Sequence, residues 1–364
     1  MVNVVLAGGG TAGHTSPLIA TAHRLAELDP QGTQVAIGTP KGLESRVVPD
    51  AGLELELISP VPMPRKPSAE LAMVPLRLTR AVGEAKEKLR KHKAEVLVGF
   101  GGYVATPAYI AAKQLSIPIV VHEQNSVPGL ANKVGARVAA SVYCAFPDTP
   151  LAGAECIGLP LRPEITSLDR PAERQRAREL FELRPDLPVL LVSGGSQGAR
   201  SINEATQDAC ADLLAAGVQI LHVLGRKNYS EDMRSETNED TGATYLPVAY
   251  VNQMELAYAA ADLMVARSGA GTVVETAVVG LPTIFVPLPH GNGEQARNAE
   301  AVVHAGGAKL LADNALSGAW MSGEIPGLIH DTAGLERMSA IGQELVARDA
   351  AEVLAQRVLD VARQ

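Results

Sequence analysis

The stretch from Ala266 to Asn298 concentrates residue types that bind a nucleotide. It begins at the end of a short apolar run and continues with a glycine-rich turn and a predicted helix, which contains Glu275 and ends at Gly280. A strand, a glycine turn and a helix N-terminus together favour phosphate, because backbone N–H groups and the positive end of the helix dipole converge there. A carboxylate one turn into the helix can accept hydrogen bonds from a ribose diol. We therefore interpret this stretch as a nucleotide site, with a second helix beginning near Gln295.

The N-terminal end carries a second turn of this kind, 8–14, with the sequence GGGTAGH. A predicted buried strand, 2–7, precedes the turn and a predicted helix, 15–28, follows it. The glycines fit the G-x-G-x-x-G pattern of dinucleotide sites, but such sites also place an acidic residue at the end of the second strand. Here the predicted second strand, 34–37, runs into 38–41 (GTPK) without an acid. The sequence therefore disfavours nicotinamide binding and favours a turn that lets another ligand approach the backbone.

Four polar residues, His122 to Asn125, follow a predicted buried strand at 117–121. The carboxyl end of a parallel strand is where open α/β sheets bind ligands. We interpret His122 as a core imidazole, with a ligand role as the alternative. Glu123 and Asn125 are expected to face the binding cleft.

The elements that position these residues alternate between strand and helix through both halves. The chain has 364 residues, of which 46% are hydrophobic and 20% charged, so a well-packed α/β protein with more than one core is predicted. We predict two Rossmann-like domains, 1–160 and 161–340, with parallel sheets facing a cleft. A linker is predicted at 158–171, and a helix in 341–364 is expected to pack back on the first domain.

Further elements follow from apolar runs and turn residues. Asn252 is predicted to cap a helix that ends at Ala260. The remaining predicted strands are 53–58, 95–100, 141–145, 155–157, 188–192, 218–224, 243–248, 283–286 and 308–311.

Composition excludes several classes of function. A net charge of −8 and few aromatic residues argue against nucleic-acid binding. The three cysteines, Cys144, Cys156 and Cys210, have no C-x-x-C spacing, which indicates a reducing compartment and neither a disulfide framework nor a zinc site. A strand beginning at Val2 leaves no room for a signal peptide, and no run of about 18 apolar residues is present to span a bilayer. We expect a cytosolic protein.

The segment 65–93 is locally basic in this acidic chain. A predicted helix covers 68–91, and Pro75 is expected to kink it or to begin it. One interpretation is a solvated amphipathic helix on the sheet; the alternative is a patch that rests on anionic lipid head groups. The basic residues are Arg65, Lys66, Arg77, Arg80, Lys86, Lys88, Arg90, Lys91 and Lys93, against Glu70, Glu84 and Glu87.

Five motifs occur in one order across both halves: GGTAGH (9–14), GFGGYVATP (99–107), HEQNSVPGLANK (122–133), GGSQGARSIN (194–203) and RSGAGTVVE (267–275). Together they resemble the MurG family, the N-acetylglucosamine transferases of peptidoglycan synthesis. The resemblance implies a GT-B fold with the acceptor on the N-terminal domain and UDP-GlcNAc on the C-terminal domain. It also implies inversion at the sugar, cell-wall synthesis, and peripheral association with the cytoplasmic side of the cell membrane. The acceptor it implies is a lipid-linked muramyl-pentapeptide, whose C4 hydroxyl receives the sugar.

Several donor-binding roles follow from the resemblance. Glu275 is expected to bind the ribose hydroxyls, and Ser196 to hold the diphosphate as charge builds on the departing UDP. The main chain of Val251 is expected to meet uracil, and Gln295 the hydroxyls of the sugar. Arg162 is expected to neutralise phosphate, although a surface arginine in the linker is nearly as good an interpretation. Further nucleotide contacts are expected from Ala270, Gly271, Thr272, Val273 and Val274.

An inverting transfer needs one base that takes the proton from the acceptor hydroxyl. His14 is the leading candidate, because a helix N-terminus disfavours imidazolium and keeps a neutral ring at pH 7. The alternative is that His14 only binds the acceptor diphosphate together with Thr11, Ala12 and Gly13. Glu123 is the other candidate base, and it would need burial to raise its pKa.

Two residues depart from the family pattern. Ala12 stands where many relatives carry glycine, and Glu294 stands where relatives often carry a glutamine. A carboxylate accepts hydrogen bonds but cannot donate them as an amide does, so the sugar contacts are less well defined than the nucleotide contacts. The chain has no D-x-D pair, so no metal and no cofactor are expected. The alternative function is another UDP-sugar enzyme of this plan, such as a UDP-GlcNAc 2-epimerase or a natural-product glycosyltransferase.

Overall fold

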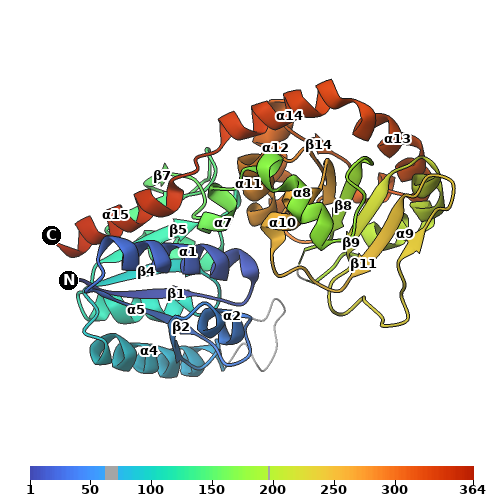
Figure 1. Cartoon of the computed structure of the whole chain (residues 1–364). Helices are drawn as coiled ribbons and strands as arrows, with labels where there is room; N and C mark the ends of the chain where they lie inside the picture. The colour runs from blue at the N-terminus through green and yellow to red at the C-terminus, as the bar shows by residue number, and fades with distance from the viewer. Residues whose placement is uncertain (62–72, 196) are drawn as a thin grey trace. The chain divides into compact units, whose positions relative to one another are not determined.

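The computed structural model describes residues 1–61, 73–195 and 197–364. The chain forms two compact units, one made of 1–162 and 347–364 and the other of 163–346. Each unit is a parallel-dominated β-sheet covered by helices on both faces (Figure 1). The α/β class and the Rossmann-like plan predicted for both halves are confirmed.

The sheet of the first unit has the order β3-β2-β1-β4-β5-β6-β7, and all its strands are parallel. This order places the carboxyl ends of the two central strands, β1 and β4, beside each other, so the loops that follow them meet at one edge. The strands are β1 (Asn3–Gly8), β2 (Thr33–Gly38), β3 (Glu54–Leu57), β4 (Val96–Gly101), β5 (Ile119–Glu123), β6 (Ser141–Cys144) and β7 (Ala154–Cys156).

Helices cover both faces of this sheet because its central strands are apolar on both sides. Helix α1 (Ala12–Leu28) and the C-terminal helix α15 (Ala350–Ala362) pack on one face, where Leu18 meets Leu354 and Val358 in one buried cluster. The other face is covered by α4 (Val74–Lys91) and α5 (Ala105–Gln114), with α6 (Leu130–Ala136) beside α5. The short α2 (Glu44–Asp50) follows β2.

The second unit repeats the plan with the strand order β10-β11-β9-β8-β12-β13-β14, in which only the edge strand β10 is antiparallel to its neighbour. Helices α9 and α13 pack together over one face, where Leu213 meets Met321 and Ile325. On the rest of the unit α8 packs on α10, and α11 on α14. The strands are β8 (Val189–Ser193), β9 (Gln219–Val223), β10 (Glu236–Thr237), β11 (Thr244–Val248), β12 (Leu263–Ala266), β13 (Thr283–Phe285) and β14 (Lys309–Leu310). The helices are α7 (Pro163–Thr166), α8 (Arg170–Leu180), α9 (Arg200–Ala215), α10 (Met254–Ala260), α11 (Ala270–Val279), α12 (Glu294–His304), η1 (Asp313–Ala315), α13 (Gly318–His330) and α14 (Thr332–Leu345).

Several local predictions are confirmed and others need correction. Gly280 ends α11 in the left-handed conformation, with φ of 67°, as its type and position predicted. Pro75 begins α4 rather than kinking it. Residues 62–72, which include the predicted start of that helix, Arg65 and Lys66, lie outside the described part of the chain.

The predicted cap at Asn252 is wrong. Helix α10 begins at Met254, with Gln253 as its N-cap and no capping hydrogen bond from that side chain. Val251 is buried and Asn252 is exposed, and the helix begins only at Met254, later than predicted. The predicted linker 158–171 is also more ordered than expected, because it contains α7 and the start of α8, which Asp169 caps. Among the described residues, no helix is long and apolar enough to cross a membrane.

Candidate functional site

The first glycine turn of unit 1 places His14 in the first turn of α1. Thr11 is the N-cap of that helix, and its hydroxyl oxygen lies 2.9 Å from Nδ1 of His14. Burial lowers the pKa of His14, while the negative charge of Glu44 and a hydrogen bond to the Gly9 backbone oppose that shift. The ring is therefore neutral at pH 7, as the sequence predicted, although burial is the largest cause. Ala12 is the first residue of α1, where a Cβ is accommodated.

Glu44 is a residue of this site that sequence reasoning missed. Its carboxylate is buried and accepts hydrogen bonds from the backbone N of Gly10 (2.7 Å), the backbone N of Thr39 (2.9 Å) and the Thr39 hydroxyl (2.8 Å). A Cβ on Gly9 would lie 2.5 Å from the carboxyl carbon of Glu44, which explains glycine there. An acidic residue is thus present after β2, but it lies beyond 38–41 and folds back under the turn. The position of Glu44, a few residues after the second strand, was the sequence signal that could have revealed it.

The second turn of unit 1, after β4, packs directly against the first. A Cβ on Gly102 would lie 2.3 Å from the carbonyl oxygen of Gly9. A Cβ on Gly101 would lie 3.3 Å from Nε2 of His14 and 3.2 Å from Nδ2 of Asn132. Both glycines have positive φ, 90° and 81°, so both turn geometry and space require glycine. The motifs GGTAGH and GFGGYVATP therefore form one structural cluster around the His14 ring.

The polar segment from His122 to Asn125 begins with the last two residues of β5, and it differs from the prediction at one position. His122 is fully buried, its Nε2 lies 2.9 Å from the carbonyl oxygen of Gly158, and burial lowers its pKa to about 4. The interpretation of His122 as a core imidazole is confirmed. Glu123 was expected to face a cleft, but it is 1% exposed, so that expectation is wrong. Asn125 is half-buried.

Glu123 is buried because it organises the loop that follows it. Its carboxylate accepts hydrogen bonds from the backbone N of Asn125 (2.9 Å), the backbone N of Gly129 (3.0 Å) and Nδ2 of Asn132 (3.0 Å). Burial raises the pKa of Glu123, and these hydrogen bonds oppose the shift. The carboxylate therefore ties β5 to the start of α6 through Asn132, the residue that lies beside Gly101.

In unit 2 the turn after β8 leads into α9. Gly195 and Gly198 have positive φ, and a Cβ on Gly198 would lie 2.1 Å from the carbonyl oxygen of Leu224. The chain is thus held tightly against the end of β9 at this point. Ser196, the predicted diphosphate residue, lies outside the described residues.

The N-terminus of α11 carries the predicted nucleotide carboxylate. Glu275 is half-buried, and the hydroxyl of the buried Tyr258 donates a hydrogen bond of 2.7 Å to its Oε2. Gly269 is the N-cap and offers no side chain, so the first N–H groups, those of Ala270, Gly271 and Thr272, point out of the helix end. Tyr258 was missed because nothing in the sequence links it to Glu275.

The side chains of Val273 and Val274 are buried, and the backbone N of Val273 donates to the carbonyl oxygen of Gly269. These two valines therefore fix α11 on the sheet. The nucleotide contacts expected from these two residues are backbone contacts, and they stay a prediction.

Arg267, just before this helix, holds three loops together. Its Nη1 donates to the carbonyl oxygens of Val286 and Pro287 and to Asp313, and its Nη2 donates to the Ser201 hydroxyl at 2.9 Å. Burial would raise the pKa of Asp313, but hydrogen bonds from Ser201 and Arg267 outweigh it and lower that pKa. This network joins the start of α9 to the loop that leads to α12.

Gln295 lies in the first turn of α12 and is half-buried. Its Oε1 accepts a hydrogen bond of 2.9 Å from the backbone N of Leu288, which orients the amide. Val251 is buried at the entrance to α10, and Arg162 is half-buried at the last residue of the first segment of unit 1. The described predicted donor residues other than Arg162 therefore all belong to unit 2.

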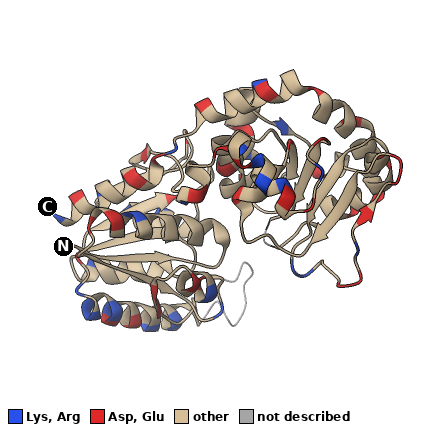
Figure 2. Cartoon of the chain, in the orientation of Figure 1, with Lys and Arg blue, Asp and Glu red and all other residues tan. Residues whose placement is uncertain are grey.

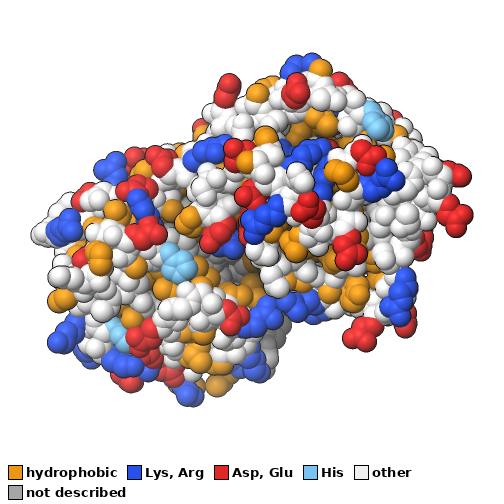
Figure 3. Space-filling view, in the orientation of Figure 1, with side chains coloured by type: hydrophobic (Ala, Val, Ile, Leu, Met, Phe, Trp, Pro, Cys, Tyr) orange, Lys and Arg blue, Asp and Glu red, His pale blue; other side chains and the backbone are white. Residues whose placement is uncertain are grey.

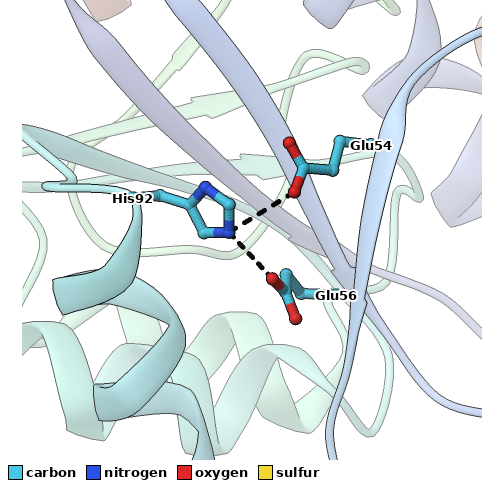
Figure 4. A group of neighbouring side chains, drawn as sticks. All are labelled: Glu54, Glu56 and His92. Carbon is cyan, nitrogen blue, oxygen red and sulfur yellow. Dashed lines mark hydrogen bonds and ion pairs between the residues drawn. The ribbon is translucent and has the colours of Figure 1, made fainter.

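A cluster of ligand-type side chains on unit 1, Glu54, Glu56 and His92, lies away from these turns (Figure 4). Nε2 of His92 lies 2.9 Å from Glu56 and 3.7 Å from Glu54. Lys88 and Lys91 also pair with Glu56, and although burial would raise its pKa, these hydrogen bonds lower it to about 2. Ammonium groups therefore already neutralise this carboxylate, and the cluster clasps β3 to the end of α4.

Both halves of the chain match models of one family. Residues 4–144 match the glycosyltransferase family 28 N-terminal domain, and residues 189–354 match its C-terminal domain. A transferase of Cutibacterium acnes, named UDP-N-acetylglucosamine--N-acetylmuramyl-(pentapeptide) pyrophosphoryl-undecaprenol N-acetylglucosamine transferase, is 58% identical over 369 residues, covering 100% of this chain and 98% of its own. The chain belongs to glycosyltransferase family 28.

Further comparisons with known proteins agree with this family assignment. A Nocardioides protein with the same name is 52% identical and covers 99% of this chain and 98% of its own. The crystal structure of Acinetobacter baumannii MurG superposes with a TM-score of 0.76 at 26% identity, covering 99% of this chain and 100% of that one. A UDP-GlcNAc 2-epimerase from Neisseria meningitidis, at 10% identity and a TM-score of 0.66, shares the fold alone. The expected membership of the MurG family and its GT-B fold class are confirmed.

Proposed function

We propose that this chain transfers GlcNAc from UDP-GlcNAc to the C4 hydroxyl of undecaprenyl-diphospho-MurNAc-pentapeptide, with inversion at the sugar. The observation that carries this proposal is the 58% identity, over 100% of the chain, to a transferase named for this donor sugar and acceptor. Identity over both units matters because donor and acceptor residues are expected on different units. The product is the lipid-linked disaccharide used in peptidoglycan synthesis.

The donor residues of unit 2 support this assignment chemically. Glu275, oriented by the Tyr258 hydroxyl, binds the ribose diol in this proposal, since a carboxylate can accept several hydrogen bonds. The N–H groups of Ala270, Gly271 and Thr272 at the helix N-terminus take the diphosphate in this proposal, and Ser196 and Arg162 add to the charge stabilisation as UDP departs. Gln295 donates its amide N–H to the sugar, because its Oε1 is already engaged by Leu288.

His14 is the proposed general base. It is the neutral imidazole of the cluster, half-buried and held by Thr11 through Nδ1, and its other ring nitrogen faces the turn at Gly101. A base with a lowered pKa remains able to take a proton at pH 7. Exposed Thr11 and Gly13, with Ala12 between them, offer the helix N-terminus to the acceptor diphosphate.

Glu123 is the less suitable base. Both of its oxygens accept hydrogen bonds within the protein, and 1% of the residue is exposed. We assign it a positioning role for Asn125 and for the loop before α6. In this proposal the half-buried Asn125, placed by that loop, contributes to acceptor binding.

A peripheral contact with an anionic membrane is proposed for α4. Figure 2 marks Lys and Arg positions in blue along the ribbon of this helix, and some of these residues are already paired, Lys88 and Lys91 with Glu56 and Arg80 with Glu84. Beside them Met73 and Leu76 are exposed, at 46% and 65%. Apolar side chains next to basic ones are what a surface-binding helix needs. The side of the membrane would be the one that holds UDP-GlcNAc, the cytoplasmic side.

Sedimentation with vesicles tests the membrane contact. The Leu76→Ser/Lys86→Glu variant should sediment less with anionic vesicles than the parent protein does, and 0.5 M salt should release the parent, since screening then acts over about 4 Å. Lys309→Glu, a matched charge change on unit 2, should sediment like the parent. Equal binding of all three proteins would contradict the contact.

Acceptor dependence of UDP release tests the function. With UDP-GlcNAc and a short-chain analogue of the lipid acceptor, UDP should accumulate only when both are present. Conversion of UDP-GlcNAc without any acceptor would favour an epimerase instead, and transfer to a soluble aglycone would favour a natural-product glycosyltransferase.

A further inference from the structure

Two of the three cysteines are direct neighbours across parallel strands. Cys144 of β6 is paired in register with Cys156 of β7. Neighbouring strands lie about 4.8 Å apart, and disulfides join residues whose Cα atoms are about 4.4–6.8 Å apart. The backbone therefore already holds these two residues at a spacing that a disulfide accepts. The sequence separation gave no sign of it, because only the strand register brings them together.

Both thiols also lie on the same face of the sheet. Register partners in a parallel sheet point to one side, and the residues two positions earlier, Val142 and Ala154, pack in the same apolar cluster under α5 and α6. Cys144 is buried and its Sγ donates to the carbonyl oxygen of Phe146 at 3.3 Å, whereas Cys156 is exposed on the edge strand. The pair thus consists of one accessible and one hidden thiol.

We propose that Cys144 and Cys156 form a reversible redox site. A low-molecular-weight disulfide, RSSR, first exchanges with the exposed Cys156 thiol, giving a Cys156–S–SR mixed disulfide and one RSH. The Cys144 sulfur then attacks Sγ of Cys156, forming the cross-strand disulfide and expelling the second RSH. The two cysteines lose two electrons and two protons in all, and these reduce RSSR to two RSH.

The environment of the two thiols supports this order of events. Burial, together with the neighbouring Cys156, raises the pKa of the Cys144 thiol to about 11, so the hidden thiol is the less reactive of the two and the exposed Cys156 exchanges first. A reversible bond formed only under oxidation also agrees with the reducing compartment that the cysteine spacing indicates.

The site lies next to residues that shape the candidate acceptor region. Cys144 is in register with Glu123 on β5, and Gly158, two residues after Cys156, accepts the hydrogen bond of His122. Gly158 also packs closely against Ala347 and Ala350 at the start of α15. Oxidation would therefore link β7 covalently to β6, and it would do so beside residues that contact His122 and the start of α15. The consequence to expect is a higher melting temperature of the oxidised protein.

Thiol mapping on the full-length protein tests the proposal. The reduced protein is exposed to 2-hydroxyethyl disulfide under native conditions, then unfolded and alkylated, and analysed by intact and peptide mass. One thiol, Cys210, should remain alkylatable, the peptides that carry Cys144 and Cys156 should be linked with loss of two hydrogens, and a reductant should restore all three thiols.

Variants separate the steps. Cys144→Ser should stop at the mixed disulfide on Cys156, Cys156→Ser should resist the reagent, and Cys210→Ser should form the cross-strand bond like the parent. Three alkylatable thiols in the treated parent, a mixed disulfide that persists on its Cys156, or a covalent dimer through Cys156 would each overturn the proposal. None of these readouts depends on transferase activity.

Discussion

The buried carboxylate of Glu44 accepts a hydrogen bond of 2.7 Å from the backbone N of Gly10. Its other oxygen accepts from the backbone and the hydroxyl of Thr39, at the end of β2. One side chain thus joins the glycine turn that precedes His14 to the neighbouring strand. The turn owes its shape to this link as well as to its glycines.

Removing the Glu44 charge should impair transfer without weakening donor binding. In Glu44→Gln the amide nitrogen cannot accept from Gly10 or Thr39, and a lost hydrogen bond to a buried charged group costs about 1–3 kcal/mol. We expect a lower kcat and an altered acceptor KM, with an unchanged Kd for UDP measured by calorimetry. Glu87→Gln, on the exposed side of α4, is the matched control. Normal turnover in Glu44→Gln would show that the link is dispensable.

The Tyr258 hydroxyl should tune donor affinity through Glu275. Tyr258→Phe removes the 2.7 Å hydrogen bond to Oε2 and leaves the packing of the ring intact. We expect KM for UDP-GlcNAc to rise about 10-fold, the equivalent of about 1.4 kcal/mol, and Glu275→Ala to raise it further. Tyr245→Phe, a buried tyrosine that contacts His222 instead, is the control. Equal KM values for parent and Tyr258→Phe would contradict this orienting role.

His14 should act on kcat rather than on donor binding. If its ring takes the acceptor proton, His14→Ala should lower kcat by about 10²–10⁴-fold, with UDP affinity unchanged. The low-pH limb of the kcat profile should lie below pH 6.5, because the pKa of His14 is lowered from its ordinary value. Glu123→Gln should instead affect stability and acceptor KM together. Near-normal kcat in His14→Ala would exclude it as the base and leave acceptor binding as its role.

Both units should lose stability as the pH falls below about 6.5. Burial lowers the pKa of His122 in unit 1 and of His222 in unit 2 to about 4 each. Between these two values the unfolded chain binds protons that the native imidazoles do not, so stability decreases on acidification, by about 3 kcal/mol per histidine in full.

Urea unfolding between pH 7 and pH 4.5 measures this effect. In His222→Gln the slope for unit 2 should decrease by about 1.4 kcal/mol per pH unit relative to the parent, whatever its stability at pH 7. His330→Gln, at the exposed end of α13, is the matched control substitution. The Glu56 cluster affects stability at lower pH. Because the pKa of Glu56 is about 2, its stabilising contribution is lost only as the pH falls below about 4.5.

Local sequence patterns predicted most of the fold but only part of the candidate site. Apolar runs located the strands of both sheets except the short edge strand β10, and residues with restricted or permissive backbone geometry, such as Pro75 and Gly280, located helix ends. The Asn252 cap failed because α10 begins later, at Met254, after an N-cap residue that makes no capping hydrogen bond through its side chain.

Residues that act through long-range contacts had no local signal. Glu44 reaches Gly10 across 34 positions, and Tyr258 reaches Glu275 across 17. Glu123 lies at the carboxyl end of β5, where ligand-binding residues are common. It is nevertheless buried, and it accepts hydrogen bonds from three donors in the following loop and α6. The pairing of Cys144 with Cys156 depends on strand register, which the spacing of cysteines does not reveal. Charges of both signs are interspersed on the face shown in Figure 3.

The most direct measurement is the fate of radiolabelled GlcNAc when the protein is given labelled UDP-GlcNAc and a short-chain muramyl-pentapeptide diphospholipid. Our account predicts that label enters the lipid fraction in step with UDP release, as a β-linked disaccharide, and that His14→Ala abolishes this transfer while still binding UDP. Release of UDP with no label in the lipid, or label recovered as a 2-epimer of the donor sugar, would contradict it.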